Sequence, residues 1–184
     1  MNNDLNIWLE RLASLHKSQM RKAAAEEKVQ LVHLEILHYL SICNKYSNTA
    51  QALSEYLGQT KGSISQSLKF IEQAEHIERR PCIEDRRVMR LHVTPKGQAC
   101  YQRMENKLMP LLSANKQALD SLQSSLAAWQ SQNGLKGFGQ CKSCQHNKIF
   151  KQGNILCNLT QEALTISDTQ KICREFIFNV NSEQ

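Results

Sequence analysis

The sequence has no long run of apolar residues. No stretch approaches the roughly 20 consecutive apolar residues that a membrane-spanning helix requires, and the first residues, 1–6, lack the basic region and apolar core of a secretory signal peptide. We therefore expect a cytoplasmic protein that does not enter a membrane. Apolar residues still make up 41% of the 184 residues, which is enough to bury a core.

The motifs of common enzyme classes are also missing. We find no set of nucleophile, base and acid, no glycine-rich phosphate loop, no histidine-rich open metal site and no internal repeat. These absences argue against an enzyme. What the chain does have is an excess of positive charge, because 23 Lys and Arg residues outnumber 17 Asp and Glu residues to give a net charge of +6. Such a balance favours a polyanionic partner such as nucleic acid without proving one.

The middle of the chain has the pattern of a helix-turn-helix. A short helix over 50–57 is predicted to end at Gly58, and a second helix is predicted from about 61 to 74. The second helix begins with small, polar and basic residues, which suits a helix whose first turns enter the major groove of DNA. Its inward-facing positions are predicted to be Ile64, Leu68 and Ile71.

A charged hairpin and a new helix follow. Residues 77–80 and 88–93 alternate apolar and polar side chains and are predicted to be two strands, with the charged segment 84–87 between them. This pair would form a wing beside the recognition helix. Thr94 and Pro95 then provide the cap and the first-turn proline that start a helix.

Apolar helical faces flank this region on both sides. Residues 4–22 form one amphipathic helix, and residues 29–43 form a helix that is apolar over most of its circumference and so belongs in the core. After Pro95 an apolar stripe continues to Trp129, interrupted at Pro110, which predicts two consecutive helices or one kinked helix. A small winged domain cannot bury so long a stripe alone. We therefore expect the N-terminal and C-terminal helices to form a homodimer interface.

With these elements placed, residues 85–97 (DRRVMRLHVTPKG) resemble the wing-to-helix signature of the MarR family of bacterial transcriptional regulators, and residues 57–68 look like its recognition region. The resemblance covers about residues 4–133. It implies a mainly α fold with a small β-wing, and a winged-helix homodimer that is usually a repressor of a pseudo-palindromic operator in double-stranded DNA. Such regulators change their grip on DNA when a ligand, metal or oxidant is sensed.

Two features depart from the family pattern. Glu75 stands where a glycine usually ends the recognition helix, so we expect this helix end to be built differently. The chain also continues about fifty residues beyond the family's usual end. The thiol sensors of the family place their reactive cysteine in the first helix, whereas residues 1–42 here contain none.

The resemblance also assigns DNA-contacting roles. At the front of the recognition helix, the residues placed at base edges or flanking phosphates are Lys61, Ser63, Ser65 and Gln66. Lys69 would contact a phosphate, and Asp85 would hold the wing turn. Arg86 and Arg87 would enter or flank the minor groove, whose negative potential favours arginine.

Four of the seven cysteines gather near the C-terminus, at Cys141, Cys144, Cys157 and Cys173. Four thiolates with this spacing, Cys-x2-Cys-x12-Cys-x15-Cys, suit Zn(II) or a [4Fe-4S] cluster, and either centre can stabilise a segment too small for its own core. We favour [4Fe-4S]. A zinc ribbon would have a second Cys-x2-Cys pair, so the spacing tells against that fold, though not against zinc itself. One such pair followed by two single cysteines resembles the ligand pattern of high-potential-type cluster proteins. A hairpin around 152–154 would carry Cys157, and 162–164 is predicted to be a helical turn.

The remaining cysteines and the basic residues near the four thiols are assigned lesser roles. Cys43 lies on the apolar second helix and is interpreted as core packing. His33 and His38 on the same helix are also interpreted as packing residues. The basic residues expected to offset the negative charge of a metal centre are Lys136, Lys142, Lys148, Lys151, Lys171 and Arg174.

The predicted organisation has five segments. These are an N-terminal dimerisation helix (1–28), a winged helix-turn-helix (29–97), dimerisation helices (98–133), a glycine-rich linker (134–140) and a four-cysteine segment (141–184). Our leading hypothesis is a repressor whose [4Fe-4S] centre senses redox state, oxygen or iron. Cluster loss would change the packing at the end of the dimer helices, and thus the ~34 Å separation of the recognition helices. The alternative is a structural zinc with a small-molecule effector or none.

Overall fold

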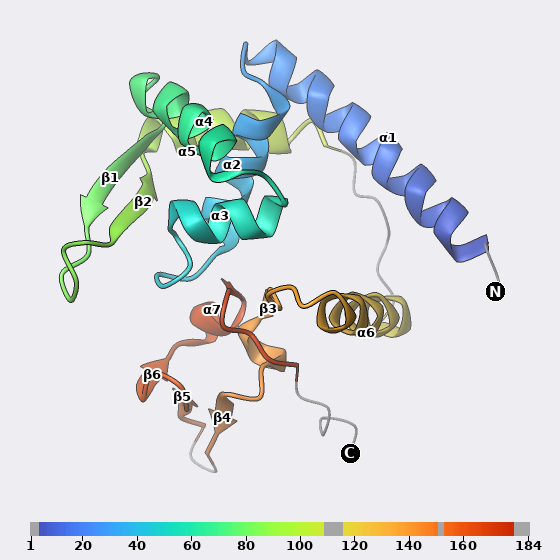
Figure 1. Ribbon diagram of the computed structural model, residues 1–184, viewed down its shortest axis with the longest axis vertical. Coiled ribbons are helices and arrows are strands. Elements are labelled where there is room, and N and C mark those ends of the chain that lie inside the picture. The colour runs from blue at the N-terminus through green and yellow to red at the C-terminus, as the bar shows by residue number, and fades with distance from the viewer. Residues whose placement is uncertain (1–3, 109–115, 151–152, 179–184) are drawn as a thin grey trace.

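The computed structural model describes residues 4–108, 116–150 and 153–178, and its arrangement is shown in Figure 1. It is mainly helical with a small β-wing, as predicted. The first part contains α1 (Asp4–Glu26), α2 (Leu31–Ile42), α3 (Ala50–Leu57), α4 (Lys61–Gln73), β1 (Ile77–Pro81), β2 (Met89–Val93) and α5 (Pro95–Glu105). The second part contains α6 (Lys116–Gln132), β3 (Gly139–Gln140), η1 (Cys141–Ser143), β4 (Asn147–Ile149), β5 (Ile155–Cys157), β6 (Glu162–Leu164), α7 (Ile166–Thr169) and β7 (Ile172–Cys173).

The core is built around α2, the helix whose sequence is apolar on nearly every side. Its side chains pack against α1, α3, α4 and α5 in one cluster. The three apolar positions predicted to face inward on α4, Ile64, Leu68 and Ile71, are fully buried there. His33 and His38 pack as expected, since His33 stacks on Phe70 and His38 bonds to the Tyr101 hydroxyl at 2.8 Å.

Threonine caps set the beginnings of α3, α4 and α5. In each case the threonine hydroxyl accepts a hydrogen bond from a backbone N–H in the first turn, at 3.2 Å for Thr49, 3.2 Å for Thr60 and 3.0 Å for Thr94. Gly58 ends α3 in the left-handed conformation with φ of 61°. The hydroxyl of Ser54 donates to the Gln59 carbonyl at 2.6 Å and closes the turn between the two helices.

The end of α4 corrects one of our expectations. Glu75 itself adopts the left-handed conformation, with φ of 59°, so the helix end is not built differently. The N–H of His76 donates to Ile71 and the N–H of Glu75 donates to Glu72, which is the Schellman arrangement that a glycine would normally allow. Glu75 is therefore held in a backbone conformation that is strained for a residue with a side chain. Its carboxylate pairs with Lys96 at 3.0 Å.

Beyond α5, the predicted break at Pro110 lies outside the described residues. The apolar stripe is carried by two separate helices, because α5 ends at Glu105 and α6 begins at Lys116. On the α6 face, Leu119, Leu122, Leu126 and Trp129 are all exposed in the single chain. None of the described helices is both long enough and apolar enough to cross a membrane.

The C-terminal part is a set of short strands. β4, β5 and β6 form an antiparallel sheet, and β3 pairs with β7. The helical turn predicted at 162–164 is wrong: these residues form β6, because their backbone pairs with β5 over Ile155 to Cys157. The predicted linker is partly structured, since Phe138 is buried and Gly139 and Gln140 form β3. Figure 1 shows this part beneath α3, with α4 on the other side of that helix.

Candidate functional site

The front of α4 is an exposed polar surface on a buried apolar base. The side chains predicted to contact DNA are all exposed, namely Lys61, Ser63, Ser65, Gln66 and Lys69. They alternate with Ile64 and Leu68, which are fully buried and fix the rotation of the helix. The Ser63 hydroxyl donates to the side chain of Gln59 at 3.2 Å, so the turn and the first turn of α4 are joined.

The wing carries its arginines as predicted from the sequence. β1 and β2 pair from Ile77 opposite Val93 to Pro81 opposite Met89. At the tip, the Asp85 carboxylate accepts from the backbone N–H of Arg87 at 3.0 Å and from its guanidinium at 3.1 Å. These bonds hold the pKa of Asp85 below its ordinary value.

Asp85 therefore holds the wing turn, as expected, and it does so through Arg87. Arg86 and Arg87 are both exposed. The wing arginines differ in that Arg87 is pre-oriented by a carboxylate, whereas Arg86 lies at the tip beside it.

Strand pairing brings the four C-terminal cysteines together. Cys141 begins η1 directly after β3, and β3 pairs with β7 so that Gly139 lies opposite Cys173. The N–H of Cys144 closes η1 by donating to the carbonyl of Cys141 at 3.0 Å. Cys157 ends β5 opposite Asn147, whose side chain donates to the sulfur of Cys141 at 3.6 Å. Register thus places thiols from three elements around one point in the fold.

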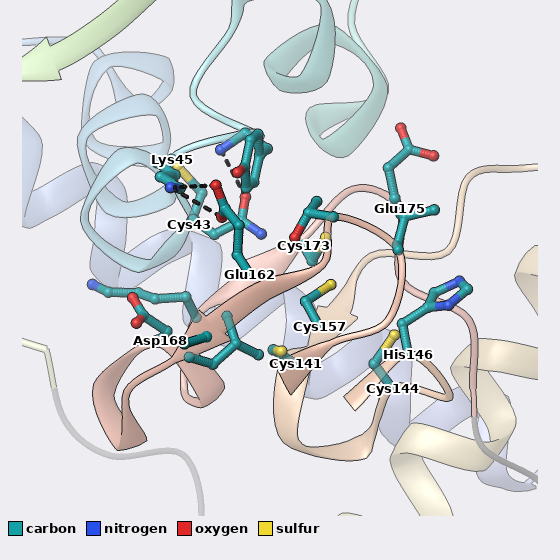
Figure 2. Close-up of a pocket in the computed structure, with 17 residues that line it drawn as sticks. Cys43, Lys45, Cys141, Cys144, His146, Cys157, Glu162, Asp168, Cys173 and Glu175 are labelled. Atoms are coloured by element: carbon teal, nitrogen blue, oxygen red, sulfur yellow. Dashed lines mark hydrogen bonds and ion pairs between the residues drawn. The ribbon is translucent and has the colours of Figure 1, made fainter. Parts of the chain in front are cut away.

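These four side chains line a common cavity of about 370 Å³. Figure 2 shows Cys141, Cys144, Cys157 and Cys173 around this space, with His146 beside Cys144. Within the described ranges, no three or more His, Cys, Asp or Glu side chains are grouped closely enough to hold a single metal ion. The four thiols border one shared space.

Burial controls the protonation of these thiols. It raises the pKa of Cys141, and the neighbouring thiols of Cys144, Cys157 and Cys173 raise it further, while the bond from Asn147 acts in the opposite direction. Burial also raises the pKa of Cys173. Burial therefore favours the neutral thiol form of Cys141 and Cys173 at neutral pH.

The cavity includes residues that sequence reasoning did not assign to it. Cys43 also lines it, at the end of α2, where it is mostly buried and has its pKa raised by burial to about 12. The apolar pattern around Cys43 could not predict this position, because the cavity reaches Cys43 through β7, a strand about 130 residues later in the sequence. Glu162 closes one side by pairing with Lys45 at 3.1 Å.

The basic residues near the cysteines are mostly engaged elsewhere. Arg174 pairs with Glu55 and Glu175, and Lys136 pairs with Glu175 at 3.3 Å. Lys171 lines the cavity but donates to the carbonyl of Ser41 at 2.7 Å. Lys142 and Lys148 are exposed, and Lys151 lies outside the described residues. The side-chain contacts therefore do not support the prediction that all six residues offset the negative charge of a metal centre.

Comparison with known proteins shows the fold of the first part of the chain. Residues 32–112 match the family model described as "Winged helix DNA-binding domain". No curated protein sequence matches the chain. Among solved structures, the chain is similar to CouR from Rhodococcus jostii RHA1 bound to p-coumaroyl-CoA, with 12% identity over 69% of this chain and 92% of that one and a TM-score of 0.57.

Two further structures show the same similarity. A MarR transcriptional regulator from Methanosarcina mazei Go1 has 17% identity over 72% of this chain and 97% of that one, with a TM-score of 0.53. The MepR–DNA complex from S. aureus has 16% identity over 69% and 96%, with a TM-score of 0.51. Each match leaves about three-tenths of this chain without a counterpart. The chain therefore has the winged helix fold of the MarR-family structures, with residues 32–112 matching the winged helix model, and its cysteine-containing part lies outside that match.

Proposed function

We propose that the chain is a homodimeric, MarR-type transcriptional repressor that binds double-stranded DNA and is regulated through a [4Fe-4S] centre sensing redox state, oxygen or iron. The exposed polar front of α4, set on a buried apolar base beside an arginine-tipped wing, is the observation that carries the DNA-binding part. The structure of MepR with DNA supports it, since that protein uses the same fold in a DNA complex. Lys61, Ser63, Ser65 and Gln66 would face the major groove.

The wing provides a direct test of DNA binding. Replacing Arg86 and Arg87 with alanine is expected to weaken binding to duplex DNA from the chain's own promoter. It should also lower the slope of log K against log salt by about one unit for each phosphate that the variant no longer binds. The measurement is fluorescence anisotropy of a labelled duplex at several salt concentrations. Lys148→Ala is the matched control, because this exposed cation lies on β4, away from α4. An unchanged slope in the double variant would contradict a DNA contact by the wing.

Exposed apolar faces support the homodimer. On α1, Ile7, Trp8 and Leu9 are all more than half exposed, at 53%, 66% and 52%. The α6 stripe described above is also exposed, so two long helices have apolar faces that no other described residue of the single chain covers. A soluble monomer rarely leaves so much contiguous apolar surface uncovered, and a second copy would cover it. Sedimentation equilibrium tests this, and a monomer at micromolar concentration would contradict it.

The cysteine cavity supports a cluster more than a zinc ion. Four thiolates around Zn(II) lie about 2.3 Å from one point, so their sulfurs are about 3.8 Å apart. In a [4Fe-4S] cluster each cysteine binds a different iron, and the sulfurs surround the cluster. Four thiols from three elements border one cavity of about 370 Å³. A cavity of this size leaves room for a group larger than one ion, which favours the cluster.

Anaerobic purification with iron, sulfide and zinc analysis tests the proposed centre. A brown protein with about four irons and four sulfides per chain supports the cluster. A colourless protein with one zinc per chain supports the alternative, a structural zinc with a small-molecule effector or none. Cys141→Ser should lose the iron. Cys100→Ser is the matched control, because Cys100 is buried in the winged-helix core and does not line the cavity.

A further inference from the structure

We infer that β7 transmits the state of the cysteine cavity to the recognition helix, because Cys173 lies on a strand whose flanking residues hold the end of α2 and one face of α3. This inference rests on the proposed function and assigns the route by which the centre would act on DNA binding. The sequence led us to expect an effect at the end of the dimer helices. The contacts of β7 point to the helix-turn-helix itself.

The first set of contacts joins β7 to the end of α2. The N–H of Asn44 donates to the carbonyl of Ile172 at 2.9 Å, and Ile172 also forms a parallel bridge with Cys43. The ammonium group of Lys171 donates to the carbonyl of Ser41 at 2.7 Å. The bond from Lys171 satisfies the Ser41 carbonyl, which lies in the last turn of α2 where carbonyls lack helical partners, and the bond from Asn44 holds the chain just after the helix. The strand therefore acts as a cap for α2.

The second set of contacts joins the residue after Cys173 to α3. The N–H of Arg174 donates to the hydroxyl of Ser47, which is buried, at 2.9 Å. The guanidinium of Arg174 forms a two-pronged ion pair with the Glu55 carboxylate, with Nη2 to Oε1 at 2.8 Å. Both side chains are mostly shielded, at 24% and 28% exposure. A shielded bidentate pair of this kind is stronger and more directional than an ordinary surface ion pair.

Aromatic packing adds a third link to the same face. The ring of Phe138, which directly precedes β3, packs edge-on against Tyr56 of α3 at 5.2 Å and against Tyr39 of α2 at 6.2 Å. β3 is the strand that pairs with β7. One side of α3 is therefore covered by the cysteine-containing part of the chain.

Movement of α3 must affect α4. Ala52 and Leu53 of α3 are fully buried in the same core cluster as Ile64 and Leu68 of α4. The turn between the helices is closed by Ser54 and Gln59, and Gln59 also bonds to Ser63 on the DNA-facing front. Packed helices of this kind move as a unit.

Cluster binding would fix β7 in place. The four cysteines would hold the cluster as thiolates, each releasing its proton to solvent and binding a different iron. Cys173 would then be tied to Cys141, Cys144 and Cys157 on other elements. Within its sheet, β7 forms two residue pairs with β3, and a two-stranded sheet of this kind is marginally stable alone. Cluster removal would therefore loosen β7 and weaken its contacts with α2 and α3.

The test compares DNA affinity with and without the cluster in a variant that breaks the Arg174 link. In the full-length chain, anaerobic loading with iron and sulfide is expected to change the affinity for promoter DNA by about tenfold, a typical coupling between two sites. Glu55→Gln should reduce this ratio to about threefold or less while iron and sulfide contents stay the same. Glu26→Gln is the control, because it breaks an exposed pair with Lys107, neither residue lines the cavity, and the full ratio should be kept.

The outcomes separate this inference from the proposed function. A wild-type chain that takes up neither iron nor sulfide overturns the cluster and the transmission together. A loaded chain whose affinity ratio is unaffected by Glu55→Gln overturns the transmission alone. Hydrogen exchange on the wild-type chain gives a second readout. Removal of the cluster should lower the protection of amides in α3 (50–57), and a loss of protection confined to residues 141–178 overturns the route through α3.

Discussion

Replacing Gly97 with alanine should destabilise the chain, because the first turn of α5 lies directly against the backbone that follows α4. A Cβ atom at position 97 would lie 2.0 Å from the carbonyl oxygen of His76 and 2.8 Å from its carbonyl carbon. The obstacle is backbone, so no side-chain rotation relieves it. The first turn of α5 would have to move by about 1 Å to reach even a tight contact distance. That movement strains the hydrogen bond from the Thr94 N–H to the His76 carbonyl, now 3.0 Å long.

The expected magnitude follows from three contributions. Forcing a methyl group into a filled space costs about 1–3 kcal/mol, and weakening one backbone hydrogen bond costs about 1 kcal/mol. Alanine regains about 1 kcal/mol relative to glycine through helix propensity. The free energy of unfolding should therefore fall by about 2 kcal/mol, which for a chain of this size lowers Tm by about 4–8 °C. Urea titration and thermal melting followed by circular dichroism measure both quantities.

Gly62→Ala is the matched control for this substitution. Gly62 also lies in the first turn of a helix, but a Cβ atom there would meet nothing within 4 Å. The same chemical change should therefore raise the free energy of unfolding by up to about 1 kcal/mol. If the free energy of unfolding falls for Gly97→Ala and rises for Gly62→Ala, contact with His76, and not the loss of a glycine, causes the destabilisation. A Gly97→Ala chain as stable as the wild type would refute the close packing of α5 against His76.

Two further predictions concern α4 and α2. Glu75→Gly should melt at a higher temperature than Glu75→Ala, because both lose the pair with Lys96 but only glycine relieves the left-handed backbone; equal melting temperatures would contradict this strain. Burial lowers the pKa of His33, so the unfolded chain binds a proton that the folded chain excludes, and stability should fall as the pH drops below about 6.5. His33→Gln keeps an acceptor for the Gln30 N–H. In this variant, the urea midpoint should depend less on pH between pH 8 and 5 than in the wild type. An unchanged pH dependence would contradict the role of His33.

The helix-turn-helix could be predicted because its signals are local. A threonine cap lies next to the helix it starts, a glycine ends a helix by its own backbone freedom, and apolar residues at helical spacing define one face. The boundaries of α3 and α4 and the buried positions Ile64, Leu68 and Ile71 all follow from such short-range patterns. Glu75 was misjudged for the same reason. Local preference favours glycine there, but packing of the surrounding chain imposes the conformation on the residue that is present.

The C-terminal part could not be predicted to the same extent because partners distant in the sequence determine its structure. β6 has only three residues, and pairing with β5, not the propensity of Glu162 or Leu164, makes it a strand. The contact between Arg174 and Glu55 spans 119 residues, and nothing near either residue indicates it. Cysteine spacing suggested which thiols belong together. It could not indicate that their cavity lies against α2 and α3.

The recognition helix is thus held from two directions that affect different parts of it. Its C-terminal end is joined to α5, where the Thr94 hydroxyl donates to the Glu75 carbonyl at 2.6 Å and Gly97 contacts His76. Its N-terminal front is joined to α3, and α3 is joined to β7 through Arg174. Dimer helices would act through the first connection and change the spacing between two recognition helices. Under the proposed function, the cysteine cavity would act through the second connection, and its state would alter how the front of α4 sits in its own half-site even at constant spacing between half-sites.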